Sequence, residues 1–239
     1  MSMRIFKIGG SVLTGRAAYG RAAGFIAAHL CAAPGDRLVV VVSAETGITD
    51  ALLAEARELD DDPDPETLDL LWSTGEVRSA ALLALALQAL GVNARAVNVH
   101  QSGLHQDGDE LTPRLSSLKV RVLLARHDVL VVPGFLARST GDRIVSLGRG
   151  GSDLSAVSFA SGIAATECRL VKDVPGYFTA DPNLDPDARP VDSLSYQEAI
   201  AIADAGCELV QRRAIEAAQR SRIPIVVTAI GYERHTLIH

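Results

Sequence analysis

Short, strongly apolar segments recur along the 239-residue chain and alternate with longer segments rich in Ala and Leu. A strand that is apolar on both faces must be covered on both faces, as in parallel sheets flanked by helices. The alternation therefore predicts an α/β fold: a three-layer α/β/α sandwich with a mainly parallel central sheet. The apolar segments read MRIFKI, RLVVVVS, ARAVNV, DVLVVP, CRLVKDV and IPIVVTA, and helices are expected over residues 17–33 and from about residue 49.

Composition and charge narrow the class of protein. A hydrophobic fraction of 48% is ample for a substantial core, and the net charge of −6 argues against nucleic-acid or anionic-membrane partners, which favour a basic face. Three widely spaced cysteines without a CxxC pattern suggest neither a disulfide framework nor a zinc site. We expect these cysteines to be reduced and mostly buried.

No targeting or membrane-spanning segment is evident from the sequence. The N-terminus MSMRIFKIGG lacks an apolar signal region, and SAALLALALQALG is too short to span a bilayer, so it is interpreted as a buried core helix ending at Gly91. A cytoplasmic location is the resulting expectation. The acidic stretch Asp60 to Glu66 is interpreted as a solvated connection, with a metal-collecting loop as the alternative.

Residues capable of chemistry gather in segments adjoining predicted strands or helices. Ligands of open α/β sheets bind beyond the carboxyl ends of the strands, where loops lead into helix N-termini. We therefore expect one site at that edge of the sheet. The segments concerned are KIGGSVLTG, SAETGITDAL, STGEVRS, PGFLARSTGD, GRGGSD and KDVPGYFTADPN.

The segment SLGRGGSDLSAV is the most specific of these signals. Its glycines permit close backbone approach, and either Ser152 or Asp153 is expected to cap a helix through Leu154 to Ala164. Free amides at such a helix start predict a phosphate or carboxylate site. The alternative is a glycine-rich hairpin turn before an ordinary capped helix. A P-loop motif is absent, and GRGGSD lacks the GxGxxG spacing and follows the hairpin-like DRIVSL.

Taken in order, the motifs KIGGS, VVSAETGITDAL, STGEVRSAALL, VVPGF, LGRGGSDLSA, DVPGYFTADP, SYQEAIAIADAG and HTLI resemble the catalytic domain of the aspartokinases, within the amino acid kinase family. The resemblance covers essentially all 239 residues. It implies an eight-stranded, mainly parallel sheet of the carbamate kinase-like fold, with the amino acid bound by an N-terminal lobe (about 1–140) and ATP with Mg²⁺ by a C-terminal lobe (about 141–239). Aspartokinases generally carry ACT domains after this domain; here a single domain over 1–239 without an ACT domain is expected.

Phosphoryl transfer to an ionised carboxylate needs alignment and cancellation of like charge rather than a general base. Lys7, beside a glycine pair, is predicted to be catalytic, and Asp153 is predicted to orient Lys7 or to share Mg²⁺ through water. The alternatives are a solvated strand end for Lys7 and a helix cap for Asp153. Gly9, Gly10 and Ser11 are expected to offer free amides to phosphate oxygens. The residues predicted to bind nucleotide or phosphate are Gly9, Gly10, Ser11, Gly150, Gly151, Ser152, Lys172, Asp173, Tyr177 and Asp181.

The predicted amino acid side reads both charged ends of the substrate. The planar fork of Arg149 suits a carboxylate, and Glu76 can accept a hydrogen bond from an α-ammonium group. Ser43 and Thr49 can add hydroxyl hydrogen bonds or can serve only their local turn. Phe135 in VVPGF is assigned to the same side.

Departures from the aspartokinase pattern fall on the nucleotide side, and the stretch from Thr49 to Glu76 is also shorter than usual. Lys172 replaces a threonine, Asn183 an arginine, and Glu208 a nucleotide-contacting lysine. A carboxylate about 4 Å from a phosphate oxygen costs roughly 4 kcal/mol before screening. Either Lys172 compensates Glu208, or the nucleotide sits differently, or ATP is not the donor.

The sequence therefore predicts a kinase that transfers the γ-phosphoryl group of ATP to the side-chain carboxylate of aspartate or a close analogue. One alternative is an enzyme of the same fold that acts on another carboxylate or phosphate. The other is a nucleotide-binding protein without turnover. The expected partners are an acidic amino acid and ATP, and a homo-oligomer is left open.

Overall fold

The apolar segments form one eight-stranded sheet in a computed structural model that describes residues 2–108, 112–182 and 184–239. Six neighbouring strands, from β13 to β3 in the order β13-β9-β1-β2-β6-β3, are parallel, and β14 runs antiparallel to β13. The predicted mainly parallel sheet is thus confirmed. Its strands are β12 (Ser193–Leu194), β14 (His235–Ile238), β13 (Ile225–Ala229), β9 (Cys168–Lys172), β1 (Met3–Ile8), β2 (Arg37–Val42), β6 (Val129–Pro133) and β3 (Ala94–Ala96).

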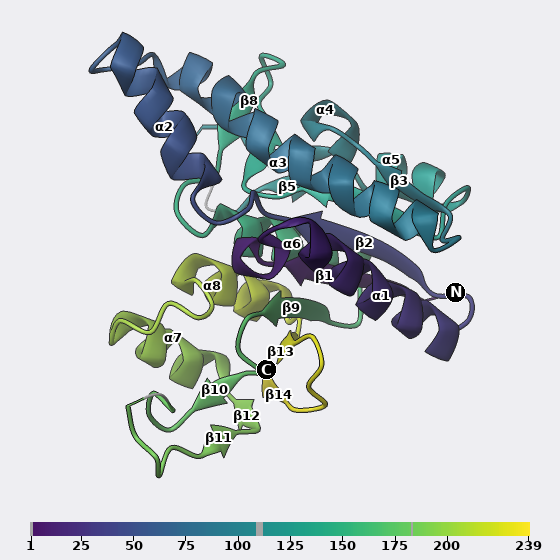
Figure 1. The fold of residues 1–239 in the computed structure, drawn as a ribbon, viewed down its shortest axis with the longest axis vertical. Coiled ribbons are helices and arrows are strands. Elements are labelled where there is room, and N and C mark those ends of the chain that lie inside the picture. Colours follow the sequence, from purple (N-terminus) through teal and green to yellow (C-terminus); the bar gives the residue numbers. More distant parts are fainter. Residues whose placement is uncertain (1, 109–111, 183) are drawn as a thin grey trace.

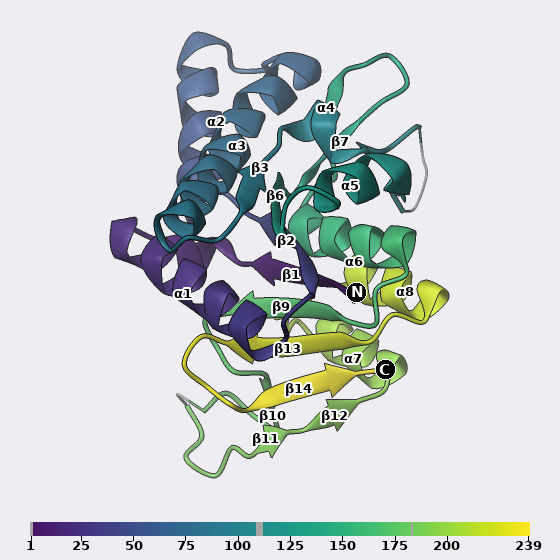
Figure 2. The same cartoon turned by 90° about the vertical axis from the view of Figure 1, so that its right-hand side faces the viewer.

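Helices cover both faces of this sheet, as Figures 1 and 2 show. One layer contains α1 (Arg16–Ala32), α2 (Ile48–Leu59) and α3 (Pro65–Ala89). The opposite layer contains α5 (Ser117–Leu124), α6 (Gly151–Ile163) and α8 (Arg212–Ser221), with α7 (Tyr196–Asp204) packed on α8. The short helices are α4 (Val99–Ser102) and the 3₁₀ helix η1 (Gly10–Leu13). The three-layer sandwich is confirmed.

Two small sheets accompany the large one. The hairpin formed by β7 and β8 leads directly into the glycine-rich loop before α6, as its hairpin-like sequence predicts. Together the small sheets contain β4 (Leu104–His105), β5 (Arg114–Leu115), β7 (Leu136–Arg138) and β8 (Ile144–Ser146) in one, and β10 (Tyr177–Phe178) and β11 (Pro190–Val191) in the other.

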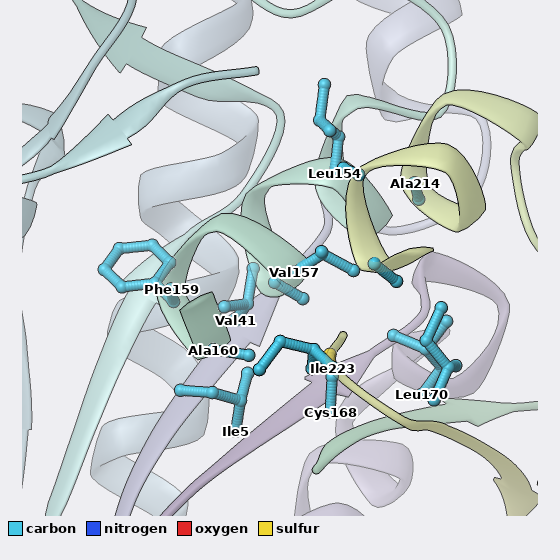
Figure 3. Packing of buried hydrophobic residues seen from close by; sticks show 14 of the residues in the cluster. Ile5, Val41, Leu154, Val157, Phe159, Ala160, Cys168, Leu170, Ala214 and Ile223 are labelled. Carbon is cyan, nitrogen blue, oxygen red and sulfur yellow. The ribbon is translucent and has the colours of Figure 1, made fainter. Parts of the chain in front are cut away.

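Because the strands are pleated, the core has two parts, one on each face of the sheet. The same pleat determines which face the charged residues point to. Ile5 and Leu170 belong to the core under α6, part of which Figure 3 shows, whereas Phe6 packs with α1 and α3 on the other face. Side chains alternate along a strand. Lys7 and Lys172 each follow a residue of the α6-side core by two positions, so both lysines face the start of α6.

Helix α3 is longer than the sequence suggests. It begins behind the N-cap Asp64, whose carboxylate accepts a hydrogen bond from the Thr67 amide, and it runs for 25 residues. By length and composition alone, α3 could cross a membrane, so the expectation that this segment is too short is wrong. In the fold, α3 packs on α1 and the sheet and buries Leu83 and Leu87, which agrees with the predicted core helix.

The cysteines are less buried than the sequence predicts. Cys168 is buried, but Cys31 and Cys207 are exposed, so the prediction that the cysteines are mostly buried is wrong. All three are free thiols, as expected. Asn183, one of the departures on the nucleotide side, lies outside the described residues.

Candidate active site

Two adjoining cavities lie at the carboxyl ends of the parallel strands. The smaller cavity, of about 290 Å³, and the larger cavity, of about 500 Å³, share Lys7, Ala44, Thr49, Lys172 and Glu208. The smaller cavity is further lined by Ser43, Glu76, Phe135, Gly150, Gly151, Ser152, Asp153 and Gln211. The larger cavity is further lined by Gly9, Gly10, Ser11, Glu45, Thr46, Gly47, Asp50, Asp173 and Leu209.

Two ammonium groups meet one carboxylate where the cavities join. Lys7 Nζ lies 2.9 Å from Asp153 Oδ1, and Lys172 Nζ lies 2.8 Å from Asp153 Oδ2. All three side chains are largely buried, with Asp153 only 3% exposed. With all three groups ionised, the cluster carries one net positive charge, which favours an anion next to the two lysines.

The protonation of this cluster follows from its surroundings. Burial raises the pKa of Asp153, but the ammonium groups of Lys7 and Lys172 outweigh burial and hold that pKa far below its usual range. Burial lowers the pKa of Lys172, and the carboxylate of Asp153 opposes this effect. Asp153 is therefore a permanent anion that keeps two lysines in place, and it is not a general base.

The start of α6 differs from the predicted cap. The N-cap is Gly150, with φ +73°, which has no side chain to cap the helix, and the Asp153 carboxylate is engaged by the two lysines instead. The prediction that Ser152 or Asp153 caps this helix is therefore wrong. The amides of Gly151 and Asp153 donate to the carbonyls of Gly148 and Gly150, so fewer amides are free at the helix start than expected.

Glu76 is the second buried carboxylate of the smaller cavity. It is 3% exposed, and its Oε2 has no hydrogen-bond partner among the described residues. Burial raises the pKa of Glu76 to about 8, while the Ala44 amide and the charge of Lys7 act in the opposite direction. A buried, under-satisfied carboxylate is a ready acceptor for a cationic group of a ligand.

The first glycine loop depends on the close approach of two backbones. A Cβ on Gly10 would lie 2.3 Å from the Ala44 carbonyl oxygen, so only glycine fits between β1 and the loop after β2. The Gly9 amide donates to the Val171 carbonyl at 3.0 Å. It is thus occupied by the sheet, and the expectation that Gly9 offers a free amide is wrong. Gly10 and Ser11 line the larger cavity.

The second glycine loop is closely packed as well. A Cβ on Gly150 would lie 2.0 Å from Gln211 Cγ, and one on Gly151 would lie 2.7 Å from Leu147 Cβ. Phe135 lines the smaller cavity with a φ of +66°, and its ring meets Trp72 edge-on, 5.9 Å between centroids. This packing fixes part of the wall of the smaller cavity.

Three predicted site residues do not line either cavity. Arg149 is exposed on the loop before α6, next to the cavity-lining Gly150. Tyr177 is 3% exposed within the hydrophobic core, and Asp181 is exposed beyond β10. The remaining predicted residues line one or both cavities.

Lys172 and Glu208 share both cavities without pairing. Lys172 pairs with Asp153, whereas the Glu208 carboxylate accepts a hydrogen bond of 3.5 Å from Gln211 Nε2. No ion pair joins Lys172 to Glu208 among the residues that the structure describes. Any compensation between them therefore acts through the ligand space rather than by direct contact.

Among the lining residues that the sequence did not indicate, two make contacts that shape the site. Glu45 lies in the larger cavity and binds three separate groups, and Gln211 packs against the loop before α6. A charged residue in the loop SAETGITD was a signal for Glu45. For Gln211, no local pattern in the sequence indicated a role.

An α/β sandwich with a lysine–aspartate–lysine cluster and glycine loops at its strand ends defines a domain for binding small anionic ligands. The family model for the amino acid kinase family matches residues 2–229, and the chain belongs to that family. Aspartate kinase from Pseudomonas putida is 34% identical over 196 residues, which are 81% of this chain and 48% of that protein. Aspartokinase 2 from Bacillus subtilis is 33% identical over 208 residues, which are 85% of this chain and 51% of that protein. The chain thus spans about half the length of these relatives.

Solved structures show the same fold. Aspartate kinase from Synechocystis superposes with a TM-score of 0.88 at 33% identity, covering 100% of this chain and 40% of that chain. Aspartokinase III from E. coli, in complex with aspartate and ADP, has a TM-score of 0.84 at 23% identity, covering 100% of this chain and 64% of that one. At that identity the second likeness supports the fold alone.

Proposed function

We propose that this domain transfers the γ-phosphoryl group of ATP to the side-chain carboxylate of aspartate or a close analogue. The observation that carries the proposal is the Lys7–Asp153–Lys172 cluster at the junction of two cavities. One of these cavities contains the buried carboxyl group of Glu76, which can accept a hydrogen bond from the substrate. The larger cavity suits the nucleotide, and the smaller cavity suits the amino acid. The bacterial relatives named as aspartate kinases support the same assignment.

The chemistry requires little from the protein beyond position and charge. A side-chain carboxylate oxygen of the substrate attacks the γ-phosphorus, the bond to the bridging oxygen breaks, and ADP leaves with that electron pair. No proton has to be removed, since the acceptor is already ionised at neutral pH. Lys7 and Lys172 neutralise charge on the transferred group from both sides of Asp153.

Recognition of the acceptor uses the other charged groups. Glu76 accepts a hydrogen bond from the α-ammonium group, and this cation replaces the proton that burial favours on the free carboxyl group. Arg149 takes the α-carboxylate with its planar fork from the loop beside the smaller cavity. Ser43 and Thr49 supply hydroxyl groups from the loop after β2.

Magnesium would accompany the nucleotide. Among the described residues no group of three or more His, Cys, Asp or Glu side chains could hold a metal ion by itself. Mg²⁺ at nucleotide sites is commonly held by one or two carboxylates together with phosphate oxygens, and Asp173 and Glu208 are both exposed carboxylates of the larger cavity. These residues fit the ion, which when bound would offset the negative charge of the phosphates. Glu208 would then face Mg²⁺ rather than repel the polyphosphate.

Aspartate-dependent release of ADP, with hydroxylamine trapping of the acyl phosphate, tests the proposal. We expect turnover that needs ATP, Mg²⁺ and L-aspartate. Turnover with another acid only would favour a relative of the same fold with a different acceptor, and nucleotide binding without turnover on any acid would favour a non-catalytic protein. A cytoplasmic enzyme, free or as a homo-oligomer, is the setting that we propose.

A further inference from the structure

Glu45, in the loop after β2, holds three elements together through one carboxylate. Its Oε1 accepts hydrogen bonds from Arg78 Nη1 of α3 at 2.5 Å and from Tyr19 Oη of α1 at 3.0 Å. Its Oε2 accepts a hydrogen bond from the Gly15 amide at the start of α1, at 3.3 Å. Tyr19 Oη also lies 3.2 Å from Ser79 Oγ, so Ser79 can donate to the tyrosine while the tyrosine donates to Glu45.

Most of this network is shielded from water. Ser79 is fully buried, Tyr19 is 5% exposed, and the Glu45 side chain is 15% exposed, while Arg78 lies at the surface. Burial raises the pKa of Glu45, but hydrogen bonds from Arg78, the Gly15 amide and Tyr19 outweigh burial and lower it. Glu45 is therefore an anion at neutral pH. A lone surface ion pair has little effect on stability, but four groups on two helices converge here.

The residue before Glu45 touches the candidate active site. Ala44 and Glu76 line the same cavity, where hydrogen bonding from the Ala44 backbone lowers the pKa of Glu76, and the Ala44 carbonyl fills the space beside Gly10. A Cβ on Gly75 would lie 3.4 Å from Ala44 Cβ, so the loop is held between two glycines. Arg78, the partner of Glu45 on α3, lies two positions after Glu76. Glu45 thus anchors the loop to the same helix, within one turn of Glu76.

We propose that Glu45 is a positioning residue: its carboxylate holds the loop after β2 so that the Ala44 amide stays on Glu76. The Ala44 amide is the protein donor that favours the ionised form of Glu76. The other charged groups facing Glu76 are Lys7 from β1 and, across the smaller cavity, Asp153, Lys172 and Glu208. Among the described residues, none of these groups forms a hydrogen bond or an ion pair with Glu45.

The direction in which the Glu76 pKa changes distinguishes a positioning role of Glu45 from the loss of its negative charge alone. Deleting the negative charge of Glu45 would by itself lower the pKa of Glu76, because one repulsive charge is removed. Losing the Ala44 hydrogen bond would raise that pKa, because the ionised form loses its donor. A hydrogen bond to a charged group corresponds to a rise of about 1 in pKa. The two mechanisms therefore predict opposite shifts.

Titration of Glu76 by NMR of ¹³C-labelled glutamate carboxyl groups in the ligand-free protein tests the proposal, with Glu76→Gln to assign the signal. We expect Glu45→Ala to raise the Glu76 pKa by about 1. A smaller rise is expected for Tyr19→Phe, which removes the hydroxyl that links Ser79 to Glu45 without changing charge and remains informative where the alanine variant does not fold. An unchanged or lowered pKa in these variants would overturn the proposal.

Asp128→Ala serves as the matched control, because it removes the Arg37–Asp128 ion pair (2.9 Å) at the amino ends of the strands, away from both cavities. Its Glu76 pKa should equal that of the wild type. The effect on substrate rests on the proposed function: at pH 7 the KM for aspartate should rise about tenfold in Glu45→Ala, in proportion to the ionised fraction of Glu76. A wild type without turnover would contradict the proposed function and leave the NMR result on Glu45 intact.

Discussion

Replacing Glu76 with glutamine is expected to change how the stability of this domain depends on pH. Burial raises the pKa of Glu76 from 4.5 to about 8, and the residue is 3% exposed. Its contribution to stability is fully present below the unfolded-state pKa of 4.5 and is lost as pH rises through the folded-state pKa of about 8. Between pH 5 and pH 8.5 this loss amounts to roughly 4 kcal/mol. Glutamine does not titrate, so Glu76→Gln escapes the loss.

Urea unfolding of both proteins at pH 5 and at pH 8.5 measures the effect, with the slope against urea checked for constancy. The difference in unfolding free energy between Glu76→Gln and wild type should move in favour of glutamine by roughly 4 kcal/mol as pH rises. Glu66→Gln is the control, because Glu66 lies on the same helix but pairs with Arg143 at the surface. A difference that is the same at both pH values would refute the argument that burial keeps Glu76 protonated.

Three further predictions follow from the geometry of the site. Arg149→Lys should lower aspartate affinity by roughly 1.5 to 3 kcal/mol in calorimetric titration and leave nucleotide affinity nearly unchanged; equal losses would place the arginine at the phosphates. Lys172→Ala should weaken ATP binding, and Glu208→Lys should strengthen it in the absence of Mg²⁺, where the carboxylate faces the phosphates directly; restoring the threonine and lysine pattern at both positions should show a coupling of about 0.5 to 3 kcal/mol, and simple additivity would show that the two residues do not share a ligand. Gly10→Ala should cost roughly 1 to 3 kcal/mol in unfolding free energy, because its Cβ would meet the Ala44 carbonyl, and an unchanged melting temperature would contradict that contact.

The sequence predicts the sheet because each short apolar segment is stable only as a strand that is covered on both faces. Parallel strands covered on both faces must be largely apolar, and Lys7 and Lys172 lie near the carboxyl ends of their strands, where water and ligands reach. Their convergence on Asp153 follows from the period of the strands, which places each lysine on the same face as a core residue two positions earlier. Residues that share this edge could thus be predicted to meet.

Other parts of the site depend on pairings that no local pattern contains. An acidic residue early in a helix is usually a cap or a partner of the helix dipole, but at Asp153 the two lysines provide a stronger interaction than the helix amides. Tyr177 lies within a motif of the candidate site, yet its ring packs in the hydrophobic core on the α6 side of the sheet. Glu45 binds Tyr19, which is 26 positions away in the sequence, and Arg78, which is 33 positions away. Only the folded chain brings these residues together.

The most direct test of the central claim follows the acceptor atom itself. L-Aspartate labelled with ¹³C at the side-chain carboxyl group, mixed with ATP, Mg²⁺ and the domain, can be observed by ¹³C and ³¹P NMR as the reaction proceeds. We expect a new carboxyl signal split by phosphorus, formed together with ADP, and its absence in Lys7→Met. Consumption of ATP without that coupled signal, or no consumption with aspartate, would contradict the account of an aspartate side-chain acceptor between Glu76 and the two lysines.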